Sequence, residues 1–296
     1  MTIENDRSAQ VKVSPVISKI ISMQASLTVR EGEIAQYVIQ HPDKIINSTI
    51  TTVAKHTGTS EASINRFCKK IGYKGFNGFK IALAQETFYN TIHARQAEDQ
   101  PSGPIPSIMH DYVNMLISTS AMQDEEVLEN AISCLQNAEN IYILSFDNTL
   151  MVAQDLQYKF DLVGIHAIDV HMPSNIQTFC SNVSERDLII VIVPTILLKD
   201  IYRAVTTCKD RGAHILAITS YDSPKLDHIV DFKFVTCDKI TAQNSIGLSN
   251  NLMFLYITDI IYCTLLQKNR NLQQKKLAVD ASLNDQLHIE HYMLEY

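Results

Sequence analysis

The 296-residue sequence predicts two domains of different fold class. The N-terminal part is predicted to be an all-α helix-turn-helix domain, because only helical patterns occur before about residue 95. The C-terminal part is predicted to be an α/β domain with a doubly wound parallel five-stranded sheet, because short β-branched runs there alternate with helical stretches. A proline-rich stretch at residues 101–106 separates the two patterns.

The first clear helix of the N-terminal part begins after Thr28. Thr28 and Glu31 have the spacing of a capping box, in which a hydroxyl and a carboxylate satisfy N–H groups at the start of a helix. Ile34, Tyr37 and Val38 then form one apolar face, and the helix is expected to end near residue 42.

Two further helices are predicted with the spacing of a helix-turn-helix. One runs from Thr49 to Thr57 and is stopped by Gly58, and the next is capped by Ser60 and ends at about residue 70. Ile64 and Phe67 are expected to face inward against the first helix of the pair, at Val53 and Ala54. Any helical hairpin with a glycine turn could match this spacing, so an ordinary hairpin stays open as an alternative.

The outward side of the second helix favours binding to a polyanion. Residues 55–80 contain six Lys or Arg residues and one Glu, although the whole chain carries a net charge of -7. Side chains near the helix N-terminus are expected to read base edges, and lysines further on to contact phosphates, with a solvated basic face as the alternative. The candidate DNA-binding residues are Ser60, Glu61, Ser63, Asn65, Arg66, Lys69, Lys70, Lys74 and Lys80.

The domain boundaries follow from Pro101, Pro104 and Pro106, which lie beside small polar residues and are expected to prevent a regular helix. The expected division is a DNA-binding domain at 1–94, a linker at 95–107, an α/β domain at 108–270 and a C-terminal tail at 271–296.

The α/β domain is expected to contain five strands with helices between them. The predicted strands are 141–145, 165–170, 188–193, 214–219 and 232–236. The predicted helices are 150–163, 174–182, 198–211, 224–230 and a final one at 246–268. This alternation favours right-handed crossovers that cover both faces of the sheet.

The segment from Leu27 to Lys80 closely resembles the N-terminal domain of the RpiR/MurR family of bacterial transcription regulators. The resemblance is carried by Leu27-Thr28-x2-Glu31 and by the run from Gly58-Thr59-Ser60 through Arg66-Phe67-Cys68-Lys69-Lys70-Ile71-Gly72-Tyr73 to Phe79-Lys80. It implies a DNA-binding domain joined to a C-terminal SIS (sugar isomerase) domain that typically senses phosphosugars. The implied partners are double-stranded operator DNA, a sugar or sugar-phosphate effector, and a second copy of the chain in a homodimer or homotetramer.

The two phosphate-binding turns that the resemblance implies are altered in this chain. The glycine-rich turn after the first strand is replaced by Ser145-Phe146-Asp147-Asn148-Thr149, and the serine-rich turn after a later strand by a segment that includes Pro194 and Thr195. Asp and Asn tolerate a left-handed backbone better than other side chains, but a carboxylate about 4 Å from a phosphate repels it by about 1 kcal/mol in water-like surroundings and about 4 kcal/mol at an effective dielectric near 20.

The candidate ligand-binding residues of the SIS-like domain are therefore Ser145, Asn148, Thr149, Thr195 and Ser220. Two interpretations stay open. The effector is a different or less anionic sugar derivative, or the domain is an oligomerisation scaffold that binds no effector. A phosphosugar isomerase is disfavoured, because the substrate anchor is altered and only Asp147 offers a nominal base.

Several other classes are disfavoured by the sequence. The six cysteines are each at least 26 residues from the next, so neither zinc nor redox CxxC spacing occurs, and no metal or cofactor is expected. The longest apolar runs are shorter than the roughly 20 residues that a membrane span needs. With an acidic start instead of a signal peptide, we expect a cytoplasmic protein. The family resemblance implies that it is a DNA-binding regulator of carbohydrate or amino-sugar metabolism and not an enzyme.

Overall fold

The computed structural model describes residues 15–98, 103–170 and 179–291, and the chain divides into two units. The first unit extends to Met122 and also includes Cys237–Leu248, and the second comprises Gln123–Thr236 and the chain from Ser249 onward. The helical first unit and the five-stranded second unit confirm the predicted fold classes.

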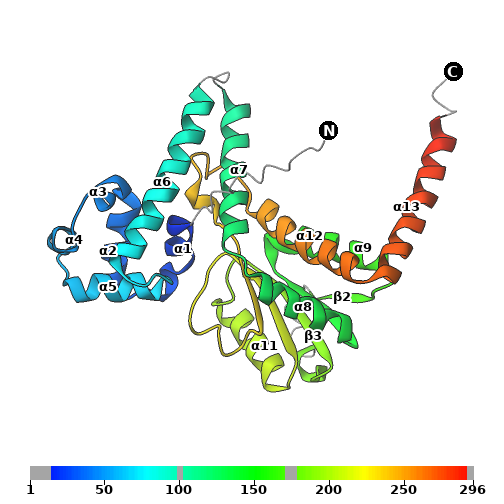
Figure 1. Cartoon of the computed structure of the whole chain (residues 1–296). Helices are drawn as coiled ribbons and strands as arrows, with labels where there is room; N and C mark the ends of the chain where they lie inside the picture. The colour runs from blue at the N-terminus through cyan, green and yellow to red at the C-terminus, as the bar shows by residue number, and fades with distance from the viewer. Residues whose placement is uncertain (1–14, 99–102, 171–178, 292–296) are drawn as a thin grey trace, which may run out of the picture. The chain divides into compact units, whose positions relative to one another are not determined.

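The first unit is built from helices (Figure 1). They are α1 (Val16–Ser22), α2 (Val29–Gln40), α3 (Pro42–Ile46), α4 (Ile50–His56), α5 (Glu61–Lys70), α6 (Phe76–Glu98) and α7 (Pro104–Ala121). The capping box before α2 is confirmed, because Glu31 N donates to Thr28 Oγ1 and Thr28 N donates to Glu31 Oε2. Ile34, Phe67 and Phe79 are among the fully buried side chains that join α2, α5 and α6 in one core.

A carboxylate from α6 caps the start of α1. Pro15 at the N-cap has no side-chain acceptor, so the N–H groups of Val16 and Ile17 donate instead to Glu86 Oε2, at 3.0 and 3.2 Å. Glu86 is 6% exposed. Burial raises the pKa of this carboxyl to about 7, although the two backbone hydrogen bonds favour the ionised form.

The expected linker at 95–107 is helical at both described ends, which differs from the expectation that its prolines prevent a helix. α6 continues to Glu98, and α7 begins at Pro104. Proline is compatible with the first turn of a helix, where its missing N–H has no intrahelical partner. The functional boundary between 94 and 108 stays a prediction.

The second unit contains a parallel sheet of five strands. They are β1 (Asn140–Ser145), β2 (Ala167–Val170), β3 (Asp187–Ile192), β4 (His214–Thr219) and β5 (Phe232–Val235), in the order β2-β1-β3-β4-β5. All four neighbouring pairs are parallel, and the register places Ile143 opposite both Asp169 and Ile190. Each predicted strand is found, with its ends moved by at most two residues.

Helices cover both faces of this sheet, as the doubly wound prediction requires (Figure 1). One face packs against α8 (Glu125–Asn137), α9 (Leu150–Asp161) and α12 (Asn251–Lys268), and the other packs against α11 (Lys199–Asp210). Alternate strand residues supply the two cores: Ile143 and Ile190 lie on the first face, and Leu144 and Val191 on the second.

Three expectations for the chain after residue 103 need correction, and two helices there were not anticipated. The predicted helix at 224–230 is wrong, because residues 224–229 form successive turns held by bonds such as Leu226 N to Ser223 O. The final helix of the SIS-like domain begins at Asn251 and not at 246, because residues 244–249 include turns. The expected tail at 271–296 is largely helix α13 (Arg270–His291). Helices α7 and α8, before β1, were not anticipated from the sequence.

The predicted helix at 174–182 is only partly open to comparison. Residues 179–182 are helical, and residues 174–178 lie outside the described part of the chain.

Candidate DNA-binding helix and effector-binding edge

The helix-turn-helix is formed by α4 and α5 with the geometry that its spacing predicts. Thr49 caps α4 and Ser60 caps α5. Gly58 lies between them with φ 61°, and a side chain in that left-handed conformation would be strained. Ile64 and Phe67 on α5 are at most 1% exposed, so the inward face is the predicted one.

The N-terminal end of α5 carries short polar side chains at the surface. Ser60 Oγ accepts from Ser63 N at 3.2 Å, and its hydroxyl also lies 2.9 Å from Ser63 Oγ. Glu61 Oε1 accepts from Thr51 Oγ1 at 2.6 Å, which joins the surfaces of α4 and α5. These contacts hold the end of α5 at which a major-groove helix would meet base edges.

Three more of the nine candidate DNA-binding residues hold α5 or α6 against other parts of the first unit. Asn65 Oδ1 accepts from Phe76 N at 3.0 Å, so this amide holds the start of α6. Lys70 Nζ donates to Glu31 Oε2 at 2.7 Å and to the carbonyl of Ser26. Lys80 Nζ donates to the carbonyl oxygen of Ser48 at 2.9 Å.

The ion pair of Lys70 also changes its carboxylate partner. Burial alone would raise the pKa of Glu31, but the hydrogen bonds from Lys70 and Thr28 lower it below its usual 4.5. Both side chains are at most a quarter exposed. This geometry favours a structural role for Lys70 over a phosphate contact.

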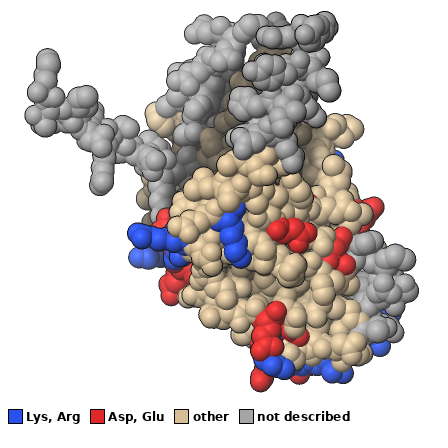
Figure 2. Space-filling model, turned by 90° about the vertical axis from the view of Figure 1, so that its right-hand side faces the viewer, with Lys and Arg blue, Asp and Glu red and all other residues tan. Residues whose placement is uncertain are grey.

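The remaining cations leave a smaller basic surface than the sequence suggested. Arg66, Lys69 and Lys74 are exposed, and Arg66 Nη2 lies 3.3 Å from Ser63 Oγ. Figure 2 shows another face of the molecule, on which uncharged side chains cover most of the described surface and charged side chains lie in small groups. Arg66 can make paired hydrogen bonds to a base or phosphate, and the two lysines are suited to phosphates.

The second unit has a topological switch between β1 and β3. β1 lies at the point where the strand order reverses, and the turns that leave β1 and β3 therefore diverge to opposite faces of the sheet. In open parallel sheets ligands bind beyond the carboxyl ends of the strands at such a point. All five candidate ligand-binding residues follow or end β1, β3 or β4 at this edge.

Asp147, in the turn after β1, has a left-handed backbone, which an Asp tolerates better than most residues, as expected from the sequence. This residue has φ 54°, the left-handed conformation, so it occupies a glycine-like backbone position. Ser145 is fully buried, and its Oγ has no hydrogen-bond partner among the described residues. Asn148 is exposed, whereas Thr149 is buried and its Oγ1 lies 2.6 Å from the carbonyl oxygen of Ile192.

The turns after β3 and β4 are joined mainly by their own hydrogen bonds. The carbonyl of Pro194 accepts from the N–H groups of Ser220 and Tyr221 and from the hydroxyl of Thr219. Thr195 Oγ1 accepts from Leu197 N at 3.2 Å. Ser220 is buried, with its hydroxyl 2.9 Å from that of Thr236.

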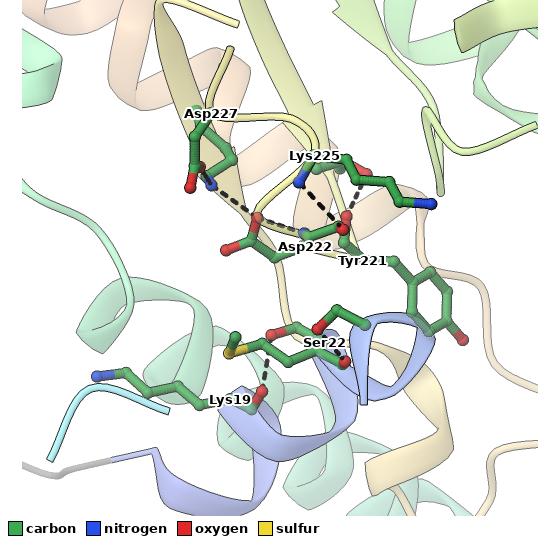
Figure 3. Close-up of polar contacts among 11 residues, drawn as sticks. Lys19, Ser22, Tyr221, Asp222, Lys225 and Asp227 are labelled. Carbon is green, nitrogen blue, oxygen red and sulfur yellow. Dashed lines mark hydrogen bonds and ion pairs between the residues drawn. The ribbon is translucent and has the colours of Figure 1, made fainter. Parts of the chain in front are cut away.

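The chain beyond Ser220 continues as a turn fixed by acidic side chains (Figure 3). Asp222 Oδ1 accepts from Ser223 N at 2.7 Å, and Ser223 Oγ accepts from Lys225 N at 3.3 Å. Lys233 Nζ forms ion pairs with Asp222 and Asp227, each at 2.7 Å. A single ammonium group therefore pairs with both carboxylates on this side of the edge.

One residue at the edge was missed by sequence reasoning. Asn251, at the start of α12, donates from Nδ2 to the carbonyl of Asn148, and its Oδ1 is buried without a partner in the described structure. Together with Ser145 it gives this edge two polar atoms that a ligand could satisfy. The Ser249-Asn250-Asn251 run at a helix start was the available signal.

Membrane-spanning helices and clusters of metal ligands are both absent from the part of the chain that the structure describes. None of the helices there is long and apolar enough to cross a membrane. Within the same residues, His, Cys, Asp and Glu side chains do not gather in threes or more as they would around a metal ion.

Comparison with protein families gives two matches along the chain. Residues 15–89 match the model of the rpiR-family helix-turn-helix domain. Residues 134–231 match the model of the SIS domain. The first match contains α1 to α5 and most of α6, and the second contains the strands β1 to β4 and ends just before β5.

Individual relatives align over nearly the whole chain. An uncharacterised HTH-type transcriptional regulator of Clostridium perfringens is 22% identical over 91% of this chain and 99% of its own. A second one, of Caldanaerobacter subterraneus, is 27% identical over 88% and 93%. Among solved structures, the Vibrio vulnificus NanR protein complexed with ManNAc-6P is similar in fold, with a TM-score of 0.56 and 19% identity, over 91% of this chain and 98% of that one.

Proposed function

The chain belongs to the RpiR family of helix-turn-helix proteins that also carry a SIS domain, and from this premise we propose that it is a transcriptional regulator of carbohydrate or amino-sugar metabolism. The observation that carries the proposal is α5, which is capped and packed as a recognition helix with Arg66 and Lys69 exposed. Relatives that align with most of this chain and most of their own length are named as transcriptional regulators.

The DNA contacts divide into two kinds. Ser60, Ser63 and Arg66 lie on the N-terminal and outer part of α5 and would reach base edges in the major groove. Lys69 and Lys74 would contact phosphates and fix the register without reading sequence. Asn65, Lys70 and Lys80 would act by holding α5 against its neighbours.

The effector would bind at the carboxyl edge of β1 and β3. Ser145 Oγ and Asn251 Oδ1 are buried there with no hydrogen-bond partner among the residues that the structure describes, and Asp147 holds the turn in a left-handed conformation. The solved relative in complex with ManNAc-6P supports a sugar-derived effector. An effector changes operator affinity only if it binds the DNA-competent and DNA-incompetent states differently.

A scaffold role for the SIS domain is the second candidate. It is favoured by the internal hydrogen bonds of Thr149, Thr195 and Ser220, which engage three of the five candidate ligand groups. In either case two copies would place their α5 helices about one helical turn of DNA apart, on a site with two half-sites.

The experiment has two arms and uses the full chain. Selection from random double-stranded DNA should enrich a two-part site with half-sites roughly 10 base pairs apart, centre to centre. Recovery of DNA without a common sequence would contradict the assignment of a specific regulator.

The second arm is a thermal-shift screen against sugar phosphates, neutral sugars and amino sugars. A ligand that raises the unfolding midpoint and changes affinity for the selected DNA supports the sensing role. Specific DNA binding with no ligand response supports the scaffold.

A further inference from the structure

Two cysteines from distant parts of the second unit lie side by side in its core. Cys180 belongs to the helical residues 179–182 before β3, and Cys208 lies in the last turn of α11. Their Sγ atoms are 3.4 Å apart, and the residues are 3% and 0% exposed. A disulfide has sulfur atoms about 2.05 Å apart, so a shift of little more than 1 Å would join them.

The hydrogen bond between the two thiols makes them chemically unequal. The Cys208 thiol donates to Cys180 Sγ, and this bond lowers the pKa of Cys180 despite burial, with a smaller effect from the charge of Arg211. The same bond, together with burial, raises the pKa of Cys208. Such a pair supplies one sulfur that ionises more easily. The neighbouring thiol can form a disulfide with that sulfur once it is oxidised.

The other cysteines provide an internal contrast. Burial raises the pKa of Cys68 to about 12, and it also raises those of Cys134 and Cys237. Cys263 is exposed on α12. Among the described residues, Cys180 and Cys208 are the pair whose sulfur atoms are in hydrogen-bond contact.

We propose that Cys180 and Cys208 are a redox-sensitive dithiol that a peroxide converts into a disulfide. The Cys180 thiolate attacks one peroxide oxygen, so an S–O bond forms, the O–O bond breaks, and the second oxygen leaves as water after protonation. Cys208 sulfur then attacks Cys180 sulfur, the S–O bond breaks, and that oxygen leaves as a second water with the Cys208 proton. Two thiols and one hydrogen peroxide give one disulfide and two waters.

The disulfide would restrain the part of the unit that leads into β3. It would close a loop of 27 intervening residues and tie the segment at 179–182 to the end of α11. α11 begins directly after the β3 turn, and Cys208 lies in its last turn, so the bond would anchor the end of α11 that lies away from the effector-binding edge. Oxidation is expected to raise the midpoint of thermal unfolding by roughly 4 °C or more.

The test treats the folded full chain with hydrogen peroxide, blocks remaining thiols with N-ethylmaleimide, and maps tryptic peptides without reduction. The expected product joins residues 160–186 to residues 204–209, has lost two hydrogens, and separates again with dithiothreitol. The matched control C263S should give the same product, and C208S should lose it. C208S should instead leave Cys180 as a sulfenic acid that dimedone captures.

Two results would overturn the proposal. In the first, both Cys180 and Cys208 are recovered alkylated while Cys263 in the same sample is oxidised. In the second, Cys180 is found joined to a cysteine other than Cys208. Both results are read on the wild-type chain, so they do not depend on whether a variant folds.

Discussion

Glu86 makes the stability of the helical unit depend on pH in a direction that the structure determines. Its buried carboxyl accepts the N–H groups of Val16 and Ile17 through one oxygen, Oε2. Glu86→Gln keeps an oxygen at that position and removes the charge. We therefore expect the variant to retain both hydrogen bonds and to lack the cost of a buried carboxylate.

The magnitude follows from the raised pKa. Burial raises it from 4.5 to about 7, so folding favours the protonated form of Glu86. The stability that this carboxyl contributes is complete below pH 4.5 and is lost as the pH rises through 7. At about 1.4 kcal/mol for each unit of pKa difference, wild type loses about 3 kcal/mol of unfolding free energy across this interval, on the order-of-magnitude scale.

The assay is amide hydrogen exchange of the full chain at pH 5.5 and pH 8, corrected for the intrinsic effect of pH, in peptides covering α1 and the buried part of α6. E86Q should be better protected than wild type at pH 8, and its advantage should be clearly smaller at pH 5.5. The control Glu33→Gln changes an exposed carboxyl on α2 and should show no such difference. Equal protection of wild type and E86Q at both pH values would refute the reasoning.

Three smaller predictions concern the same unit and the edge of the sheet. Gly58→Ala should cost about 1–2 kcal/mol of stability, because φ is 61° and an alanine is strained in that conformation. No atom lies within 4 Å of an added Cβ, so a steric clash does not contribute. A loss near zero in a urea titration would contradict the backbone argument. Thr28→Ala should cost about 1 kcal/mol through loss of the cap, measured by the same titration, with Gln36→Ala at an exposed position of α2 as a comparison. Asp147→Asn should keep the left-handed turn and bind a sugar phosphate about fivefold or more tightly by calorimetry, and unchanged or weaker binding would show that the carboxylate does not face the anion.

Much of the fold could be predicted because the relevant signals are local. The cap at Thr28, the turn at Gly58 and the β-branched runs each act through neighbouring residues, and all three are found. The prediction of a helix at 224–230 was wrong because Pro224 and the side chains of Asp222 and Ser223 stabilise turns instead. α7 was missed because prolines at a helix start were interpreted as helix breakers.

The candidate sites were less predictable because they depend on contacts between distant residues. Helical periodicity placed Lys70 on the outer face of α5, but its partner Glu31 lies 39 residues away. The partner of Lys80 is a backbone carbonyl, which sequence patterns do not reveal. The left-handed turn at Asp147 was anticipated from residue type alone. The hydrogen bond from Asn251 to Asn148 in the same turn joins residues far apart in the sequence, so it could be found only from the structure.

The central claim, that α5 reads an operator, is tested most directly by fluorescence anisotropy of the full chain on its selected DNA at several salt concentrations. Arg66→Ala should weaken binding and relax sequence preference by about 1–3 kcal/mol at one base position. Lys74→Ala should weaken binding to all sequences similarly and lower the salt slope by about 1, whereas Lys44→Ala, which removes an exposed lysine of α3, should leave the slope unchanged. If Arg66→Ala and Lys74→Ala both bind with wild-type affinity, preference and slope, α5 is not the recognition helix.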